Sequence, residues 1–144
     1  MTAAPLPGRQ VFRLTDKELY DRADLVVIAN AISTLDADQN PEHEKQAFNV
    51  PVHTTLEILV MLKGREPRRR VVLLHYRWLS QDREFVNPPR YLVLDPSNRQ
   101  PPSGKSFGSY LLYLKKGTHG RYEPVTGQID PIYSVKALKP IEER

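Results

Sequence analysis

The chain has 144 residues, 40% of them hydrophobic and 26% charged, which is ordinary for one folded globular domain. The absence of cysteine excludes disulfides, thiolate metal sites and a cysteine nucleophile. The net charge of +4 is a modest excess that favours acidic partners. Thirteen prolines and seven glycines favour several short strands joined by turns over a few long helices.

The beginning of the chain predicts an irregular lead-in over residues 1–15, one short helix and one strand. Thr15 and Glu18 have the spacing of a capping box, in which each residue caps the other at a helix start, so we expect a helix over 16–23. Residues 24–35 are rich in β-branched side chains and predict a strand. Both faces of this strand are apolar at its start, and we expect the helix to cover one of them. Residues 36–48 are polar and predict a loop.

The strongest periodic signal lies over residues 50–62, where alternate positions predict a strand with one core-facing side. That side is expected to carry Val50, Val52, Thr54, Leu56, Ile58, Val60 and Leu62. Residues 63–67 predict a turn, and residues 71–79 predict a third strand. Its core face is expected to carry Val72, Leu74, Tyr76 and Trp78, with His75 and Arg77 on the opposite face.

The second half of the chain predicts shorter elements. We expect a fourth strand over 91–94, a proline-rich loop over 95–108, and a hairpin of strands 110–114 and 121–125 joined at 117–120. Residues 133–138 predict either an edge strand or a helical turn. The whole pattern indicates a mainly β protein, a five- to six-stranded antiparallel OB-like barrel with one short N-terminal helix. The barrel domain is expected over residues 16–138, followed by a tail at 139–144.

Three segments carry a resemblance to a known family: Ala23–Ala29, Val60–Gly64 and Gly108–Leu114, in that order. Over residues 16–125 the chain resembles netrin-like domains and tissue inhibitors of metalloproteinases, which have an OB fold. It also resembles small exported bacterial proteins of unknown function with the same segments. The inhibitors use an amino-terminal cysteine to bind the zinc of the protease. This chain has no cysteine, so the resemblance implies the fold and does not carry that mechanism.

Catalytic and metal-binding patterns are not recognisable in the sequence. The histidines, at positions 43, 53, 75 and 119, have no close ligand spacing, and no serine lies in a GxSxG motif. Residues 104–106 resemble the end of a phosphate-binding loop, but Arg99 occupies the position of its required first glycine. We therefore predict no catalytic residue, no metal site and no cofactor, and expect solvated or hydrogen-bonded histidines.

A cluster of basic residues is the most distinctive candidate site. Lys63, Arg65, Arg68, Arg69 and Arg70 crowd the turn between the second and third strands, where Glu66 is the one acidic residue. Arg77 lies between Tyr76 and Trp78 in the next strand. OB-type barrels bind single-stranded nucleic acid with such basic and aromatic residues, but the alternation places both aromatic residues on the core face. The alternatives are a solvated turn, and charges that prevent association of sheet edges.

The function expected from these observations is a non-enzymatic interaction module that binds a protein or peptide partner. The alternative is single-stranded nucleic-acid binding through residues 63–70. The apolar stretches are far shorter than the ~20 residues of a membrane-spanning helix. The first residues lack the positive start and apolar run of a secretory signal. The compartment is left open: exported or periplasmic if a signal peptide has been removed, and cytoplasmic otherwise.

Overall fold

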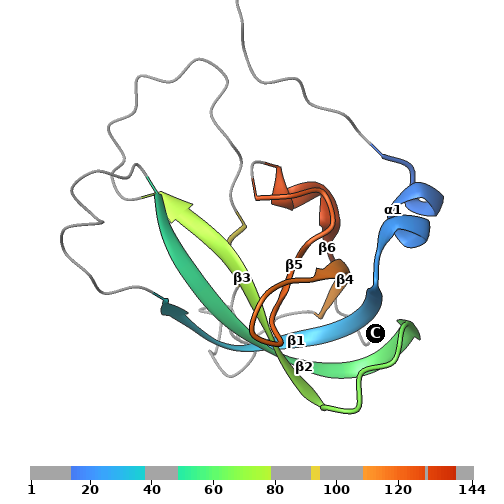
Figure 1. Cartoon of the computed structure of the whole chain (residues 1–144), viewed down its shortest axis with the longest axis horizontal. Helices are drawn as coiled ribbons and strands as arrows, with labels where there is room; N and C mark the ends of the chain where they lie inside the picture. Colours follow the sequence, from blue (N-terminus) through green and yellow to red (C-terminus); the bar gives the residue numbers. More distant parts are fainter. Residues whose placement is uncertain (1–13, 38–48, 79–91, 95–108, 129, 139–144) are drawn as a thin grey trace, which may run out of the picture.

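Figure 1 shows the computed structural model, which describes residues 14–37, 49–78, 92–94, 109–128 and 130–138. Its elements are α1 (Asp16–Arg22), β1 (Leu25–Asp36), β2 (Asn49–Lys63), β3 (Arg70–Trp78), β4 (Tyr110–Lys116), β5 (Tyr122–Pro124), a 3-10 helix (Pro131–Ser134) and β6 (Val135–Ala137). The predicted lead-in before residue 14, most of the 36–48 loop, the 95–108 loop and the tail lie outside the described residues.

Five strands close into a barrel in the order β1-β2-β3-β5-β4, with β4 pairing back to β1. β6 pairs with residues 110–112 of β4, and β5 pairs with residues 114–116. The mainly β class, the closed barrel and the short N-terminal helix are therefore as predicted. The pairing of β3 with β5 is parallel, whereas the sequence predicted an antiparallel barrel. A closed ring of five strands requires at least one parallel pair, because strand direction cannot alternate around an odd number of strands.

The barrel interior holds the main hydrophobic core, to which β1, β2, β3 and β4 each contribute. Its buried side chains are Leu25, Val27, Ala29, Ala31, Leu56, Val71, Leu73, Leu92, Leu94, Leu112, Leu114 and Tyr122. Their burial supplies the main driving force for closing the barrel.

Helix α1 packs on the outside of the barrel, as expected from the two apolar faces of β1 (Figure 1). Its Leu19 and the adjoining Ala23 form a second cluster with Val26 of β1 and Tyr113 of β4. The predicted capping box is present: the Thr15 hydroxyl accepts a hydrogen bond from the Glu18 backbone at 3.2 Å. This cap satisfies amides at the helix start and sets where the chain enters the barrel.

The predicted core face of β3 is wrong, because its buried side chains are Val71, Leu73 and His75. Val72, Leu74 and Tyr76 are half-buried instead, and the side chain of Trp78 lies outside the described residues. Apolar residues occupy both sets of alternate positions in β3, so periodicity alone could not choose between its faces. The choice follows from the register with β2, whose buried residues lie directly opposite. The opposed pairs are Leu56 with Val71, Thr54 with Leu73, and Val52 with His75.

The short strand predicted at 91–94 is not formed over its described residues, 92–94. The predicted alternation is nevertheless present, since Leu92 and Leu94 are buried and Val93 is 80% exposed. The segment contributes side chains to the core without joining the sheet.

The carboxyl-terminal region contains the predicted hairpin between β4 and β5. Its turn is closed by a hydrogen bond from the Gly117 amide to the Arg121 carbonyl at 2.8 Å. Residues 133–138 were predicted as either a helical turn or an edge strand. The structure has the 3-10 helix Pro131–Ser134 followed directly by β6.

Candidate functional site

The six predicted basic residues do not form one group. Arg77 lies near the opposite end of β3 from the turn, and its guanidinium donates to both carboxylate oxygens of Asp36, at 2.9 and 2.8 Å. These hydrogen bonds lower the pKa of Asp36. Lys63, the last residue of β2, donates to the carbonyl oxygens of Tyr20 and Asp21 at 2.6 and 3.2 Å. Lys63 therefore joins the end of β2 to α1, and Arg77 joins β3 to β1.

Arg69 and Arg70 share one carboxylate. Their guanidinium nitrogens lie 3.8 and 3.3 Å from the oxygens of Glu57, which belongs to β2. The sequence identified Glu66 as the acidic residue of this region, and the pairing of β2 with β3 adds Glu57. Two guanidinium groups facing one carboxylate leave an excess positive charge. The Arg69 side chain is 77% exposed, so this charge lies at the surface.

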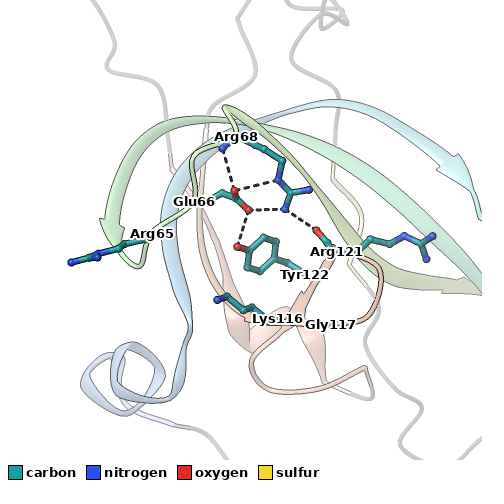
Figure 2. A pocket seen from close by; sticks show the side chains of 8 residues that line it. Arg65, Glu66, Arg68, Lys116, Gly117, Arg121 and Tyr122 are labelled. Atoms are coloured by element: carbon teal, nitrogen blue, oxygen red, sulfur yellow. Dashed lines mark hydrogen bonds and ion pairs between the residues drawn. The ribbon is translucent and has the colours of Figure 1, made fainter.

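Arg68 and Glu66 form a tighter unit that connects two turns (Figure 2). The Arg68 guanidinium donates from Nε to Glu66 Oε2 at 3.2 Å and from Nη2 to Oε1 at 2.6 Å. Nη2 also donates to the Gly120 carbonyl at 2.8 Å, and the Tyr122 hydroxyl donates to Glu66 Oε1 at 2.9 Å. The turn between β2 and β3 is thereby attached to the hairpin between β4 and β5.

The protonation states of this unit follow from its contacts. Hydrogen bonds from Arg68 hold the pKa of Glu66 at about 2, against an ordinary value of 4.5, although burial opposes the shift. Burial, and then the Glu66 carboxylate, raise the pKa of Tyr122 to about 12. At neutral pH Glu66 is therefore charged, and Tyr122 keeps the proton that it donates.

A pocket of about 260 Å³ opens between these two turns, and we call it the turn pocket (Figure 2). Its lining residues are Arg65, Glu66, Arg68, Lys116, Gly117, Gly120, Arg121 and Tyr122. Four of them are cations and one is a carboxylate. The sequence analysis identified Arg65 and Arg68 but not Lys116 or Arg121. The hairpin prediction implied that Lys116 and Arg121 are near each other. Only the parallel pairing of β3 with β5 brings them to the turn of residues 63–70, which we call the basic turn.

A second surface was missed because two of its residues, Val60 and Leu62, were predicted to face the core. Leu59, Val60, Met61 and Leu62, which we call the apolar end of β2, are 38–47% exposed. The prediction that Val60 and Leu62 face the core is thus wrong, whereas Val50 to Leu56 are buried as predicted at alternate positions. The register with β3 begins at Glu57 opposite Arg70, so the apolar end of β2 extends beyond the paired part of that edge.

The described histidines do not gather with other potential metal ligands. His75 was predicted to lie opposite the core but is buried, with Nε2 2.6 Å from the Thr54 hydroxyl. Burial lowers its pKa to about 4, and the Leu92 backbone opposes the shift. The pKa of His53 is lowered by burial and by the charge of Arg121. Among the described residues, no three histidine or carboxylate side chains gather as metal ligands.

Fold and surface together define a five-strand closed β-barrel, consistent with an OB-like fold, with a basic turn and a pocket at one end. Comparison of the sequence with protein-family models and with curated proteins gives no match in either case. Among the described residues, no helix has the length and hydrophobicity needed to cross a membrane.

Proposed function

We propose that this chain is a non-enzymatic interaction module that binds a segment of another protein. We further propose that its OB-like barrel is related in fold to netrin-like domains. The observation that carries the proposal is the exposure of four consecutive apolar side chains in the apolar end of β2. A strand in a closed barrel usually turns one set of alternate side chains inward, whereas here both sets face solvent.

The apolar end of β2 is a supported surface and not a frayed strand end. Its backbone pairs with β1, since Met61 lies opposite Val27 and Val60 opposite Ile28. At its end, the Tyr20 hydroxyl of α1 donates to the Leu62 carbonyl at 3.3 Å. Tyr20 is itself 40% exposed and extends the apolar surface. Exposed apolar residues grouped in this way are typical of protein-binding surfaces.

The charges beside this surface favour an acidic partner. The Arg69 carbonyl accepts a hydrogen bond from the amide of Ile58 at 2.8 Å, so Arg69 lies beside the residue that immediately precedes the apolar end of β2. Arg69 and Arg70 together exceed the charge of Glu57, their shared partner. A protein segment with apolar residues for β2 and carboxylates for the two arginines would complement both features.

Single-stranded nucleic acid is the alternative, and the cations of the basic turn favour it. Lys63, Arg68 and Arg77 already donate hydrogen bonds to oxygens of this chain, and Arg77 lies near the opposite end of β3 from the turn. Each would have to exchange or share those partners with phosphates. We therefore place protein binding first.

The proposal is tested with fluorescein-labelled peptides in which apolar residues alternate with Asp or Glu, using fluorescence anisotropy. We expect saturable binding of acidic peptides and little binding of matched peptides with Lys in place of the acidic residues. Val60→Ser should weaken binding about fivefold or more, the scale of a significant interface contact. The same change at Val93, which is 80% exposed on a different segment, is the matched control and should leave affinity unchanged.

Three outcomes would overturn the proposal. One is that no acidic peptide binds. Another is that Val60→Ser and Val93→Ser weaken binding equally. The third is that labelled oligothymidine binds, with an affinity that falls steeply with salt, while the peptides do not.

Sedimentation of the protein alone tests whether a second copy of the chain occupies this surface. If the chain forms a dimer that Val60→Ser dissociates, the surface is a self-interface, and the proposal of a different protein partner is overturned.

A further inference from the structure

We infer that the turn pocket binds a doubly charged phosphate group, either free phosphate or a phosphate monoester. The inference goes beyond the proposed function, because it concerns a different set of side chains and a different ligand. It rests on the charge of the pocket lining, on the anchoring of Arg68 and on the size of the pocket.

Arg68 is held in place before any ligand binds. Three of its five guanidinium N–H groups have partners, namely the two oxygens of Glu66 and the Gly120 carbonyl. The two N–H groups of Nη1 have no partner among the described residues. A guanidinium fixed by a carboxylate on one side keeps donors for an anion on the other. Its position is therefore set without a loss of side-chain entropy on binding.

Gly120 leaves this guanidinium accessible. A β-carbon added at position 120 would lie 3.4 Å from Nη1 and 3.9 Å from Nη2 of Arg68. At these distances the β-carbon would be in van der Waals contact with the guanidinium, so glycine leaves this side of it uncovered. The φ angle of Gly120 is +71°, in the region that favours glycine. The glycine that the turn geometry requires therefore also leaves Arg68 open to a ligand.

Three further cations surround the anchored one. Figure 2 shows Lys116 beside the Tyr122 ring, with Arg65 and Arg121 extending outward on opposite sides of the pocket. With Glu66 already bound to Arg68 and Tyr122, the lining carries four positive charges against one negative charge. This excess of positive charge attracts a doubly charged anion more strongly than it attracts a singly charged carboxylate ligand. The outward side chains of Arg65 and Arg121 can turn toward a bound anion.

The size of the pocket restricts what enters it. Its volume of about 260 Å³ is below the roughly 300–1,000 Å³ of sites that enclose drug-sized ligands. The pocket therefore fits one charged group and leaves the rest of a larger molecule outside. A phosphate group combines small size, double charge and several acceptor oxygens, and so matches this set of donors.

The test is a titration of the ¹⁵N-labelled protein at neutral pH and low ionic strength, followed by the amide chemical shifts of Arg65, Glu66, Arg68 and residues 117–121. Inorganic phosphate, N-acetyl-phosphoserine amide and acetate are the three probes. We expect saturable shifts with at least one phosphate compound, and about tenfold weaker binding of acetate. Tighter binding of the phosphoserine derivative identifies a monoester site, and tighter binding of inorganic phosphate identifies a site for the free ion.

Lys116→Gln should weaken phosphate binding about threefold or more, as expected for loss of a partly exposed charge pair. Lys17→Gln on α1 removes the same charge outside the pocket and should have no effect. Equal weakening by the two variants, acetate binding as tight as phosphate, or no saturable shift in the wild-type protein would overturn the inference. Val60→Ser should leave phosphate binding unchanged, because Val60 lies outside the turn pocket. A failure of the phosphate proposal is therefore distinguishable from a failure of the protein-binding proposal.

Discussion

Arg68 donates from Nη2 to the carbonyl oxygen of Gly120 over 2.8 Å, and so joins two turns that are 52 residues apart in sequence. The same nitrogen donates to Glu66 Oε1, and the Tyr122 hydroxyl donates to that oxygen as well. β3 and β5 pair at only one register position, Leu73 with Tyr122. Side-chain contacts between the turns therefore reinforce the point where the barrel closes with the fewest backbone pairs.

Glu66→Gln tests this reinforcement. The carboxylate side chain is 6% exposed and accepts hydrogen bonds from both Arg68 and Tyr122. Replacing its charge with an amide should lower the free energy of unfolding at pH 7 by about 1–3 kcal/mol, measured by urea denaturation. Asp21→Asn removes a carboxylate from the exposed surface of α1 and should change the stability by less than about 0.5 kcal/mol.

The pH dependence of this variant has a definite sign. The folded pKa of Glu66, about 2, lies below the ordinary 4.5, so its contribution is complete above pH 4.5 and is lost as pH falls toward 2. The stability difference between wild type and Glu66→Gln should therefore shrink over that interval. A difference that stays constant down to pH 2 would contradict the role given to the carboxylate.

Most of the fold was predictable because local signals and the barrel agree. The capping box at Thr15 and Glu18 located α1, and alternation over residues 50–56 identified the core face of β2. The face of β3 was not predictable, since apolar residues occupy both sets of alternate positions and only the register with β2 selects one. Long-range pairing is not encoded in the periodicity of a single strand.

The candidate site was predictable only in part, for the same reason. The cationic residues of the basic turn are adjacent in sequence, and their clustering was evident there. Lys116 and Arg121 reach the turn pocket through the pairing of β5 with β3, for which no local signal exists. The exposure of Val60 and Leu62 depends on where β3 begins, and strand ends are the least certain part of a periodic pattern.

Gly64→Ala should be more destabilising than Gly127→Ala. Both residues have positive φ angles, +100° and +85°, so both substitutions carry backbone strain. A β-carbon at position 64 would also lie 2.5 Å from the Asp24 carbonyl oxygen, whereas at position 127 nothing lies within 4 Å. We expect thermal denaturation to show an additional loss of at least about 1 kcal/mol for Gly64→Ala. Equal losses would mean that the turn after β2 can shift away from β1.

The buried His75 should make the protein less stable as pH falls. Its folded pKa of about 4 is below the ordinary 6.5, so it stays neutral in the core while the unfolded chain binds a proton. Stability is then complete above pH 6.5 and decreases toward pH 4, by up to roughly 3 kcal/mol. Urea denaturation between pH 6.5 and 5 isolates this effect from most carboxylate titration.

His75→Gln should reduce this dependence, with His53, whose pKa is also lowered, contributing the remainder. His119→Asn, a change in the exposed hairpin turn, should leave it unchanged. Because Thr54 also bonds the Thr34 hydroxyl at 2.8 Å, a substitution of His75 can disturb a buried hydrogen-bond chain. The wild-type protein provides a second measurement that needs no variant. A pKa near 6.5 for the His75 ring in an NMR titration would contradict the prediction.

The two halves of β2 should respond differently to the same substitution. Leu56 is fully buried between β1 and β3, and Leu56→Ala should lower the free energy of unfolding by about 2–5 kcal/mol. Leu62 is 47% exposed, so Leu62→Ala should lower it by less than about 1 kcal/mol. Similar losses at both positions would show that Leu62 is buried in solution. If the loss at Leu62 also depends on protein concentration, that burial is against a second molecule, and the apolar end of β2 is occupied by another copy of the chain.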